Sequence, residues 1–197
     1  MKLRIRKAKE EDIPELRQLI EVSVRTLQAQ DYTSEQMESA LESVLGVDSQ
    51  LISDGTYFVA EVQPGGTSSQ QGESPEPAEI EGRWVLAGCG GWSKRKTLYG
   101  GDHWGNRENE LLNPKHDPAK IRALFVHPEW ARRGVGGRIL EACEMAASSA
   151  GFTSYELGAT LTGAKLFGKK GYAEAEAFEV PLKSGLTLPV IRMVKKI

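Results

Sequence analysis

The sequence has little cysteine, no long apolar run and no excess of charge of either sign. Cys89 and Cys143 are the only cysteines in 197 residues, which excludes a disulfide scaffold and a multi-cysteine zinc site and is typical of a reducing compartment. No apolar run approaches the roughly 18 residues of a membrane-spanning helix, and the N-terminus lacks the apolar core of a signal peptide. The net charge of −2 argues against general nucleic-acid binding. We therefore expect a cytoplasmic protein that binds neither membrane nor nucleic acid.

Hydrophobic periodicity predicts the element order β-α-α-β-β-β-α-β-α-β-β. The strand–helix–strand unit at 119–158 predicts a parallel strand pair with a right-handed crossover, whereas the hairpins predict antiparallel pairs. We expect one α/β (α+β) domain over 1–197, with a mixed, mostly antiparallel central sheet and flanking helices.

Three helices and one loop have local sequence signals. Asp12 with Glu15 predicts a capped start for the first helix, and Thr33 or Ser34 is expected to open the second. Ile139, Leu140, Cys143, Met145 and Ala146 are expected to face inward from the helix at 134–151. The stretch 63–82 is rich in Pro, Gly, Ser, Gln and Glu, so burial cannot offset its ordering entropy. We expect it to form a mobile surface loop that joins two strands of a hairpin.

Glycine, in contrast, is abundant. The chain has 21 glycines in 197 residues, which is about 11 %, whereas the average is about 7 %. Gly134, Gly136 and Gly137 stand where the strand ending in LFV meets a helix, in the sequence LFVHPEWARRGVGGRILEACE. A helix N-terminus offers free backbone N–H groups and a partial positive charge, and glycines let a phosphate approach them. From 120 to 138, five basic residues stand against Glu129. The pattern indicates a phosphate site, and the alternative is a glycine-rich turn beside solvated arginines.

Two common phosphate motifs do not fit this unit. Ile139 stands where the dinucleotide fingerprint needs Gly or Ala, and the GK[ST] nucleotide loop is absent. Instead, VHPEWARRGVGGRIL resembles the acyl-CoA pyrophosphate loop of the GNAT superfamily of N-acyltransferases, and GATLTGAKLFGKKGY resembles that family's later strand and helix. The resemblance covers nearly the whole chain except 63–82. It implies a GNAT-like fold in which the parallel strand pair splays apart, and acetyl-CoA as acyl donor with no metal.

The resemblance assigns a set of acetyl-CoA contacts. The backbone of Gly134, Val135, Gly136 and Gly137 is expected to bind the pyrophosphate, Arg132, Arg133 and Arg138 to flank it, and Phe125, Val126 and Phe167 to border the pantetheine arm and its thiol. Three positions depart from the family pattern. Ala131 replaces the usual Gln or Arg, Leu161 replaces an asparagine, and Phe167 replaces the tyrosine that commonly protonates the departing thiolate.

The catalytic and acceptor residues are less well marked. Glu156 and Tyr155, on the strand after the glycine-loop helix, are the candidate general bases, with Asp102, His103, His116 and Asp117 as alternatives. Tyr32, Trp92, Tyr99 and Trp104 are the candidate acceptor-binding residues. Cys89 is interpreted as a buried residue and not a nucleophile, and His127 as part of a turn.

We therefore expect an N-acetyltransferase, a monomer or homodimer, that moves an acetyl group from acetyl-CoA to a primary amine by direct transfer in a ternary complex. Two alternatives stay open. One is a catalytically weak acyl-CoA-binding sensor or scaffold, favoured by Phe167. The other is a nicotinamide-dependent oxidoreductase.

Overall fold

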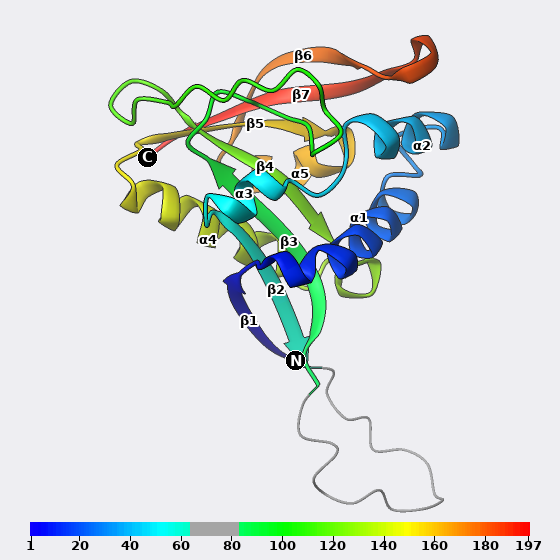
Figure 1. Ribbon diagram of the computed structural model, residues 1–197, viewed down its shortest axis with the longest axis horizontal. Helices are drawn as coiled ribbons and strands as arrows, with labels where there is room; N and C mark the ends of the chain where they lie inside the picture. Colours follow the sequence, from blue (N-terminus) through cyan, green and yellow to red (C-terminus); the bar gives the residue numbers. More distant parts are fainter. Residues whose placement is uncertain (64–82) are drawn as a thin grey trace, which may run out of the picture.

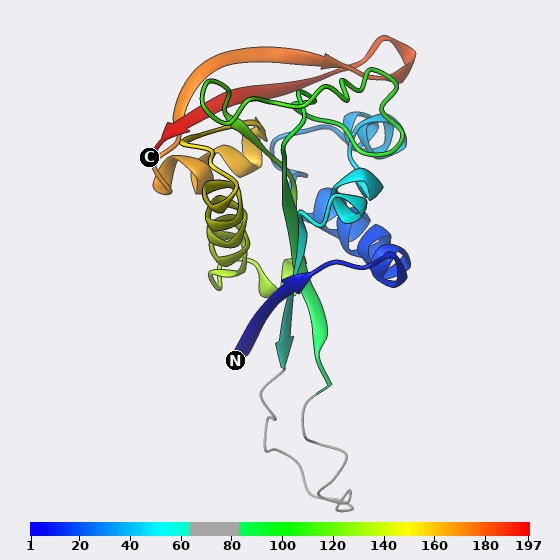
Figure 2. The ribbon, with the colours of Figure 1, turned by 60° about the vertical axis from the view of Figure 1, so that its left-hand side comes forward.

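A seven-stranded sheet with helices on both faces forms the structure, a computed structural model that describes residues 1–63 and 83–197 (Figure 1). The strand order is β1-β2-β3-β4-β5-β7-β6. Figure 2 shows α4 and α5 on one face and α1, α2 and α3 on the other. The strands are β1 (Lys2–Lys7), β2 (Tyr57–Gln63), β3 (Val85–Ser93), β4 (Ala119–Val126), β5 (Ser154–Thr160), β6 (Ala173–Pro181) and β7 (Thr187–Lys196). The helices are α1 (Ile13–Leu27), α2 (Ser34–Ser43), α3 (Ser49–Ser53), α4 (Val135–Ser149) and α5 (Leu161–Lys169).

The sheet is antiparallel except where β4 meets β5. That parallel pairing joins only Ala119 to Tyr155 and Lys120 to Glu156. Beyond it the ladder between the two strands stops, while β4 stays paired with β3 up to Val126. The predicted mixed sheet and its single splayed parallel pair are confirmed.

The two faces of the sheet carry separate hydrophobic cores. One lies under α1, α2 and α3 and includes Leu16, Ile20 and Leu51. The other lies under α4, where Ile139, Leu140 and Cys143 are buried as predicted. The prediction for Met145 is wrong: it is 71 % exposed, because the buried stripe continues at Ala147, four residues after Cys143, as the helical period requires.

Of the two predicted N-terminal helix caps, one is present and one is absent. The side chain of Thr33 caps α2 in a reciprocal pair with Gln36. The cap predicted at Asp12 is wrong, because Asp12 ends a short 3-10 turn (Glu10–Asp12) and its carboxylate accepts hydrogen bonds from Arg6 and the N–H of Lys9. A strand side chain from β1 thus competes for the carboxylate that the local sequence assigns to the helix.

Two glycines in β3 let α4 lie close to the sheet, and a third allows close packing on the opposite face. An added Cβ at Gly88 would be 2.8 Å from Ile139 Cδ1, and one at Gly90 would be 2.7 Å from Ile139 Cγ2. On the other face, an added Cβ at Gly91 would be 2.8 Å from the Tyr57 ring. These glycines are therefore sites of close packing.

Gly88→Ala is expected to lower the free energy of unfolding by about 1–3 kcal/mol, the usual cost of overpacking a core, because the added Cβ would meet Ile139 Cδ1. Denaturant unfolding measures the loss. Ile139→Val removes one methyl group from the contact and should recover part of the stability in the double variant. An alanine variant as stable as the wild type would contradict this close packing.

Two segments lack regular structure or lie outside the described residues. The predicted loop at 63–82 lies outside the described residues except for Gln63, which ends β2. Residues 94–118 form an irregular segment with a single bridge between Arg95 and Leu111. No helix within the described ranges is long and apolar enough to cross a membrane.

Candidate active site

The widening gap between β4 and β5 opens into a cleft. Its walls are β4 and β5, the first turns of α5, the segment after α2, residues 98–101, and β6 with β7. The lining is mostly apolar, and its side chains that can hydrogen-bond are those of Gln28, Tyr99, Arg122 and Thr160. Among the predicted residues, Phe125, Phe167 and Tyr99 line it.

The glycine loop stands at one end of this cleft. Gly134 has a φ of +86° at the N-cap of α4, a left-handed conformation that favours glycine. The first N–H bond of the helix runs from Arg138 to the Gly134 carbonyl, so the N–H groups of Val135, Gly136 and Gly137 have no partner within the helix. Gly136 packs against Val126 and Leu166, and Leu166 also lines the cleft. A phosphate on these N–H groups would therefore sit beside the cleft entrance.

The basic residues before α4 divide into two groups. Arg132, Arg133 and Arg138 are exposed around the glycine loop, with Arg133 over the Trp130 ring. Lys120 and Arg122 instead point to buried carboxylates, Glu156 and Asp48. The expected concentration of five charges at one phosphate site is therefore wrong for these two residues, and three remain beside the loop.

A β-bulge shapes β4 at the bottom of the cleft. Cys89 pairs with Phe125 and Gly91 with Arg122, so Ala123 and Leu124 together lie opposite Gly90. Ala123 has a φ of +52°, which is strained for a residue with a Cβ. Tyr57 donates a hydrogen bond to the Ala123 carbonyl at 3.3 Å. A bulge turns backbone groups away from the regular ladder, here within the cleft lining.

Glu156 and Tyr155 lie outside the cleft lining. The Glu156 carboxylate, buried between β4 and β7, accepts hydrogen bonds from Lys120 and Arg192. Its burial works to raise the pKa of Glu156, but the bonds from these two cations lower it overall. The Tyr155 hydroxyl donates to the Glu144 carbonyl at 2.9 Å. Both side chains thus have structural partners, and the carboxylate is a weak base.

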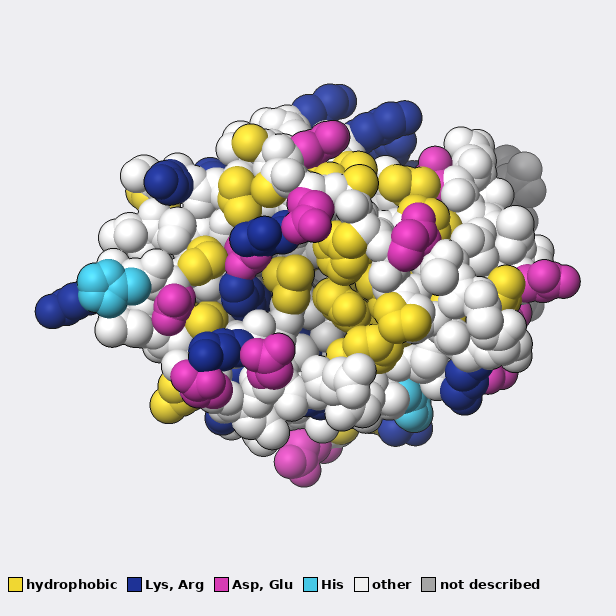
Figure 3. Space-filling view, turned by 90° about the horizontal axis from the view of Figure 1, so that it is seen from above, with side chains coloured by type: hydrophobic (Ala, Val, Ile, Leu, Met, Phe, Trp, Pro, Cys, Tyr) yellow, Lys and Arg dark blue, Asp and Glu magenta, His cyan; other side chains and the backbone are white. Residues whose placement is uncertain are grey.

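Of the four aromatic candidates, Tyr99 alone lines the cleft. It packs between Trp104 and Phe178, with ring centroids at 5.2 and 5.7 Å. On the face of the molecule formed by β6, β7 and 94–118, hydrophobic side chains gather in the middle with charged ones around them (Figure 3). Trp92 is buried against Phe152 under α4. Tyr32 has both of its hydrogen bonds used, to the Pro189 carbonyl and from the Leu161 N–H.

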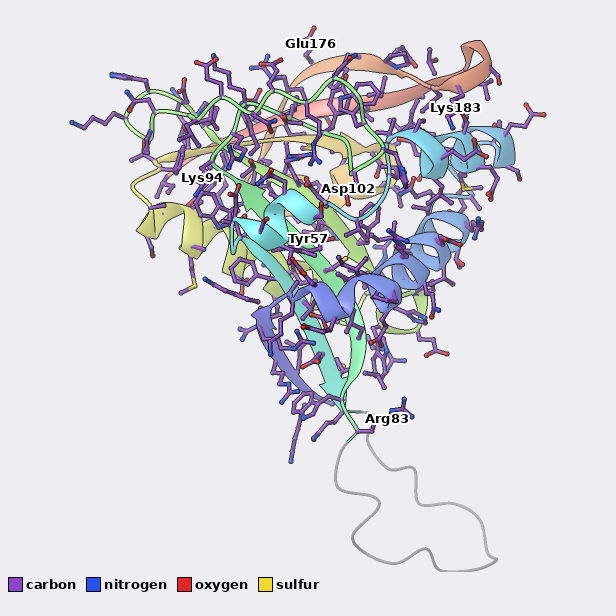
Figure 4. All side chains as sticks on the ribbon, viewed as in Figure 1. Tyr57, Arg83, Lys94, Asp102, Glu176 and Lys183 are labelled. Carbon is purple, nitrogen blue, oxygen red and sulfur yellow. The ribbon has the colours of Figure 1, made fainter. Side chains whose placement is uncertain are left out.

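The remaining candidates lie at other places. Asp102 and His103 line a neighbouring hollow beside α1 and α2, which shares Leu45 and Gly46 with the cleft. Figure 4 labels Asp102 on its irregular segment. Two further candidates, His116 and Asp117, lie beyond both hollows, and the Asp117 carboxylate accepts the N–H of Asn113.

Cys89 and His127 have the structural surroundings that the sequence predicts for them. Burial raises the pKa of Cys89 to about 12, so it is a thiol and a poor nucleophile at neutral pH. The His127 ring accepts the Glu129 N–H and shapes the turn after β4. A disulfide is not formed by either buried cysteine, and the described residues hold no cluster of potential metal ligands.

Sequence patterns missed a buried charge network at the cleft. Arg122 Nη2 lies 2.8 Å from Asp48 Oδ2, and the same guanidinium donates to the Gly100 carbonyl. Arg107 also binds Asp48, and it reaches Asp102 at 3.3 Å. Burial lowers the pKa of Arg122, and Asp48 opposes that shift. The network ties β4 to the 98–107 part of the irregular segment.

Gln28 is a second residue that sequence patterns missed. It ends α1 and is 6 % exposed, and its side-chain carbonyl oxygen has no hydrogen-bond partner among the described residues. Gln28 lines the cleft. A buried acceptor without a partner costs free energy, which a bound N–H group would recover.

Comparisons with known proteins agree with this geometry. Residues 78–174 match the family model of the acetyltransferase (GNAT) domain. A GCN5-related N-acetyltransferase from Rhodopseudomonas palustris aligns over 100 % of this chain and 97 % of its own, with 21 % identity and a TM-score of 0.65. No curated protein matches the sequence.

Two further solved structures contain the cosubstrate. PaiA N-acetyltransferase from Thermoplasma acidophilum, in complex with coenzyme A, covers 100 % of both chains at 14 % identity and a TM-score of 0.62. YncA, a putative acetyltransferase from Salmonella typhimurium with acetyl-CoA, aligns over 98 % of this chain and 93 % of its own at 15 % identity and a TM-score of 0.56. At such identities these likenesses establish the fold. The domain match over 78–174, the split sheet and the glycine loop at α4 together identify a GNAT acetyltransferase domain in this part of the chain.

Proposed function

We propose that this acyltransferase moves an acetyl group from acetyl-CoA to a primary amine of a small molecule or peptide, by direct transfer in a ternary complex. The observation that carries the proposal is the cleft between the splayed strands, which leads from the free N–H groups of α4 to the bulge in β4. The pyrophosphate would bind these N–H groups, beside Arg132, Arg133 and Arg138. The pantetheine arm would pass Val126 and Leu166 toward Phe125 and Phe167.

The bulge supplies the means to polarise the thioester. Ala123 and Leu124 break the regular ladder with β3 and line the apolar cleft, so a backbone N–H of this bulge would be the donor to the thioester carbonyl. A fixed N–H donor in such surroundings stabilises the developing oxyanion strongly, because little water competes with it. The cleft lining contains no histidine, aspartate or glutamate among the described residues. The amine therefore gives up its proton to water or to a hydroxyl, and no nucleophile is available for a covalent intermediate.

The acceptor would approach from the end of the cleft near Leu45, Gly46 and Tyr99, where the neighbouring hollow adjoins it. Gln28 offers its unpartnered carbonyl oxygen to an N–H of the amine.

Gln28→Met keeps the side-chain length and removes this acceptor, so KM for the amine is expected to rise about tenfold, the equivalent of roughly 1.4 kcal/mol. Calorimetry should show unchanged coenzyme A binding. Equal KM values in the two proteins would contradict the contact.

Thiol release from acetyl-CoA in the presence of an amine panel tests the function, with mass spectrometry of the acetylated product. Turnover of an amine supports it. The competing interpretation is an acyl-CoA sensor, favoured by Phe167 at the position of the family's tyrosine. Tight acetyl-CoA binding without turnover of any amine would support the sensor. Stabilisation by NAD and not by coenzyme A would support the oxidoreductase alternative.

A further inference from the structure

Tyr99 is the one described residue of the cleft lining that is both titratable and free of a charged partner. The only other titratable side chain in that lining is Arg122. Arg122 is held by Asp48 and the Gly100 carbonyl, and an arginine does not lose its proton in proteins. Thr160 carries a hydroxyl, but it caps α5 by accepting the Gly163 N–H. By elimination, a proton that moves within the cleft has Tyr99 as its only ionisable carrier on the described lining.

The fold holds Tyr99 firmly over the split between the strands. Its ring lies between Trp104 and Phe178, and its Cβ and Cδ1 stand 3.9 Å from the position of an added Cβ at Gly158 on β5. Gly100, with a φ of +100°, lets Trp104 pack so closely that any Cβ there would lie 2.4 Å from the Trp104 ring. The Tyr99 hydroxyl has no hydrogen-bond partner among the described residues. The phenol is therefore fixed in place while its proton stays available.

We propose that Tyr99 is the catalytic proton carrier of the acyl transfer and replaces the hydroxyl that Phe167 lacks. This inference rests on the proposed function. The general acid would then come from the irregular segment between β3 and β4, on the opposite wall of the cleft from α5, where the family's tyrosine position lies. Burial raises the pKa of Tyr99, which keeps the hydroxyl protonated at neutral pH and ready to donate.

The proton transfers balance without any other reactant. The amine nitrogen forms a bond to the acyl carbon, and the carbon–sulfur bond breaks with its electron pair on sulfur. Tyr99 donates its proton to that sulfur, so the products are the thiol and a tyrosinate. The surplus proton on the acylated nitrogen then passes to the tyrosinate, directly or through water, and restores Tyr99. One proton thus moves from nitrogen to sulfur in each turnover.

Tyr99→Phe tests the proposal, because it keeps the ring between Trp104 and Phe178 and removes only the hydroxyl. We expect kcat to fall about 10²-fold, at the low end of general acid–base effects, with coenzyme A affinity and melting temperature unchanged. The wild-type pH–rate profile should fall at high pH as Tyr99 ionises, and the variant should lose that limb. Tyr172→Phe is the matched control. Its hydroxyl is buried near Glu144 and lies outside the cleft lining, so kcat should stay within about twofold.

A second substitution separates a catalytic role from a packing role. Phe167→Tyr restores a hydroxyl from the other wall of the cleft, so it should raise kcat of the Tyr99→Phe variant at least tenfold. A Tyr99→Phe variant with the wild-type kcat and an unchanged pH profile would overturn the role of Tyr99 and leave the proposed function intact. A wild-type protein without turnover of any amine would instead contradict the proposed function. A variant that loses both activity and melting temperature, with no rescue by Phe167→Tyr, would show that Tyr99 only packs.

Discussion

Gly136→Val is expected to weaken coenzyme A binding by about 10²–10⁴-fold. A Cβ at Gly136 would stand 3.1 Å from Leu166 Cδ2 and 3.3 Å from Val126 Cγ2, and the two further carbons of valine would fill the passage from the α4 N-terminus to the cleft. The loss would include two charge-assisted hydrogen bonds to phosphate, each contributing about 1.5–3 kcal/mol, and each 1.4 kcal/mol is a factor of ten in affinity.

Thermal unfolding with and without ligand measures this effect. Wild-type protein at a coenzyme A concentration of 100 times Kd gains about 2.7 kcal/mol, which is roughly 5–11 °C for a domain of this size. At the same concentration, a variant that binds 10²-fold more weakly gains at most about 0.4 kcal/mol, or roughly 1–2 °C. Its melting temperature without ligand shows whether the fold has survived, and Gly136→Ala, whose single Cβ meets only movable side-chain ends, is the milder version if valine unfolds the protein.

Two other glycines sharpen the interpretation. Gly134→Val has open space around its Cβ but a φ of +86°, so it tests the left-handed cap that sets the direction of the N–H groups. Gly105→Val is the matched control, because Gly105 has neither a positive φ nor any atom within 4 Å of an added Cβ. Normal ligand-induced stabilisation in both Gly134→Val and Gly136→Val would show that phosphate binds elsewhere.

The sequence was sufficient for features that depend on neighbouring residues. Strand alternation, the Thr33 cap and the glycine run before α4 are local patterns, and the structure contains a strand, a helix cap and a left-handed N-cap at these places. The inward stripe of α4 was also predicted, except at Met145. Even there the error is local, because the helical period itself continues the stripe at Ala147 and leaves Met145 outside.

The features that the sequence did not reveal are contacts between distant segments. Glu156 resembled a catalytic carboxylate because it follows the helix of the glycine loop, but its partners Lys120 and Arg192 each lie 36 residues away. Arg122 looked like a phosphate ligand because it precedes that loop, whereas its carboxylate partner, Asp48, lies between α2 and α3. Charge counts along a chain cannot show which charges the sheet turns inward.

Asp48→Ala is expected to destabilise the protein by about 3–5 kcal/mol, the usual cost of leaving a buried charge without its partner. Asp48 is fully buried, and the Arg122 side chain is 4 % exposed. Removing the carboxylate leaves the guanidinium with the Gly100 carbonyl as its only acceptor and frees Arg107 from its buried partner. Denaturant unfolding should show the loss, and the melting temperature should fall by roughly 6–20 °C.

Two further variants distinguish an unpaired charge from a simple cavity. Asp48→Ala with Arg122→Met removes both charges, so it should regain at least half of the lost stability, because a buried ion pair replaced by apolar groups is often neutral. Asp102→Ala removes an outer member of the same network, with its side chain 34 % exposed, and should cost about 1 kcal/mol or less. A double variant as unstable as Asp48→Ala would mean that lost packing, and not the unpaired Arg122, causes the destabilisation.

The ion pair between Asp48 and Arg122 also positions the cleft wall that holds Tyr99. Arg122 holds the Gly100 carbonyl, and Gly100 follows Tyr99 directly in the chain, so the pairing with Asp48 fixes the wall from which Tyr99 faces β5. Asp48→Asn keeps the side-chain shape and removes the charge. It should therefore lower kcat under conditions where the protein is still folded, while coenzyme A, whose pyrophosphate we propose to bind at the far end of the cleft, binds as before. Loss of coenzyme A binding in this folded variant would show that the two ends of the cleft are not independent.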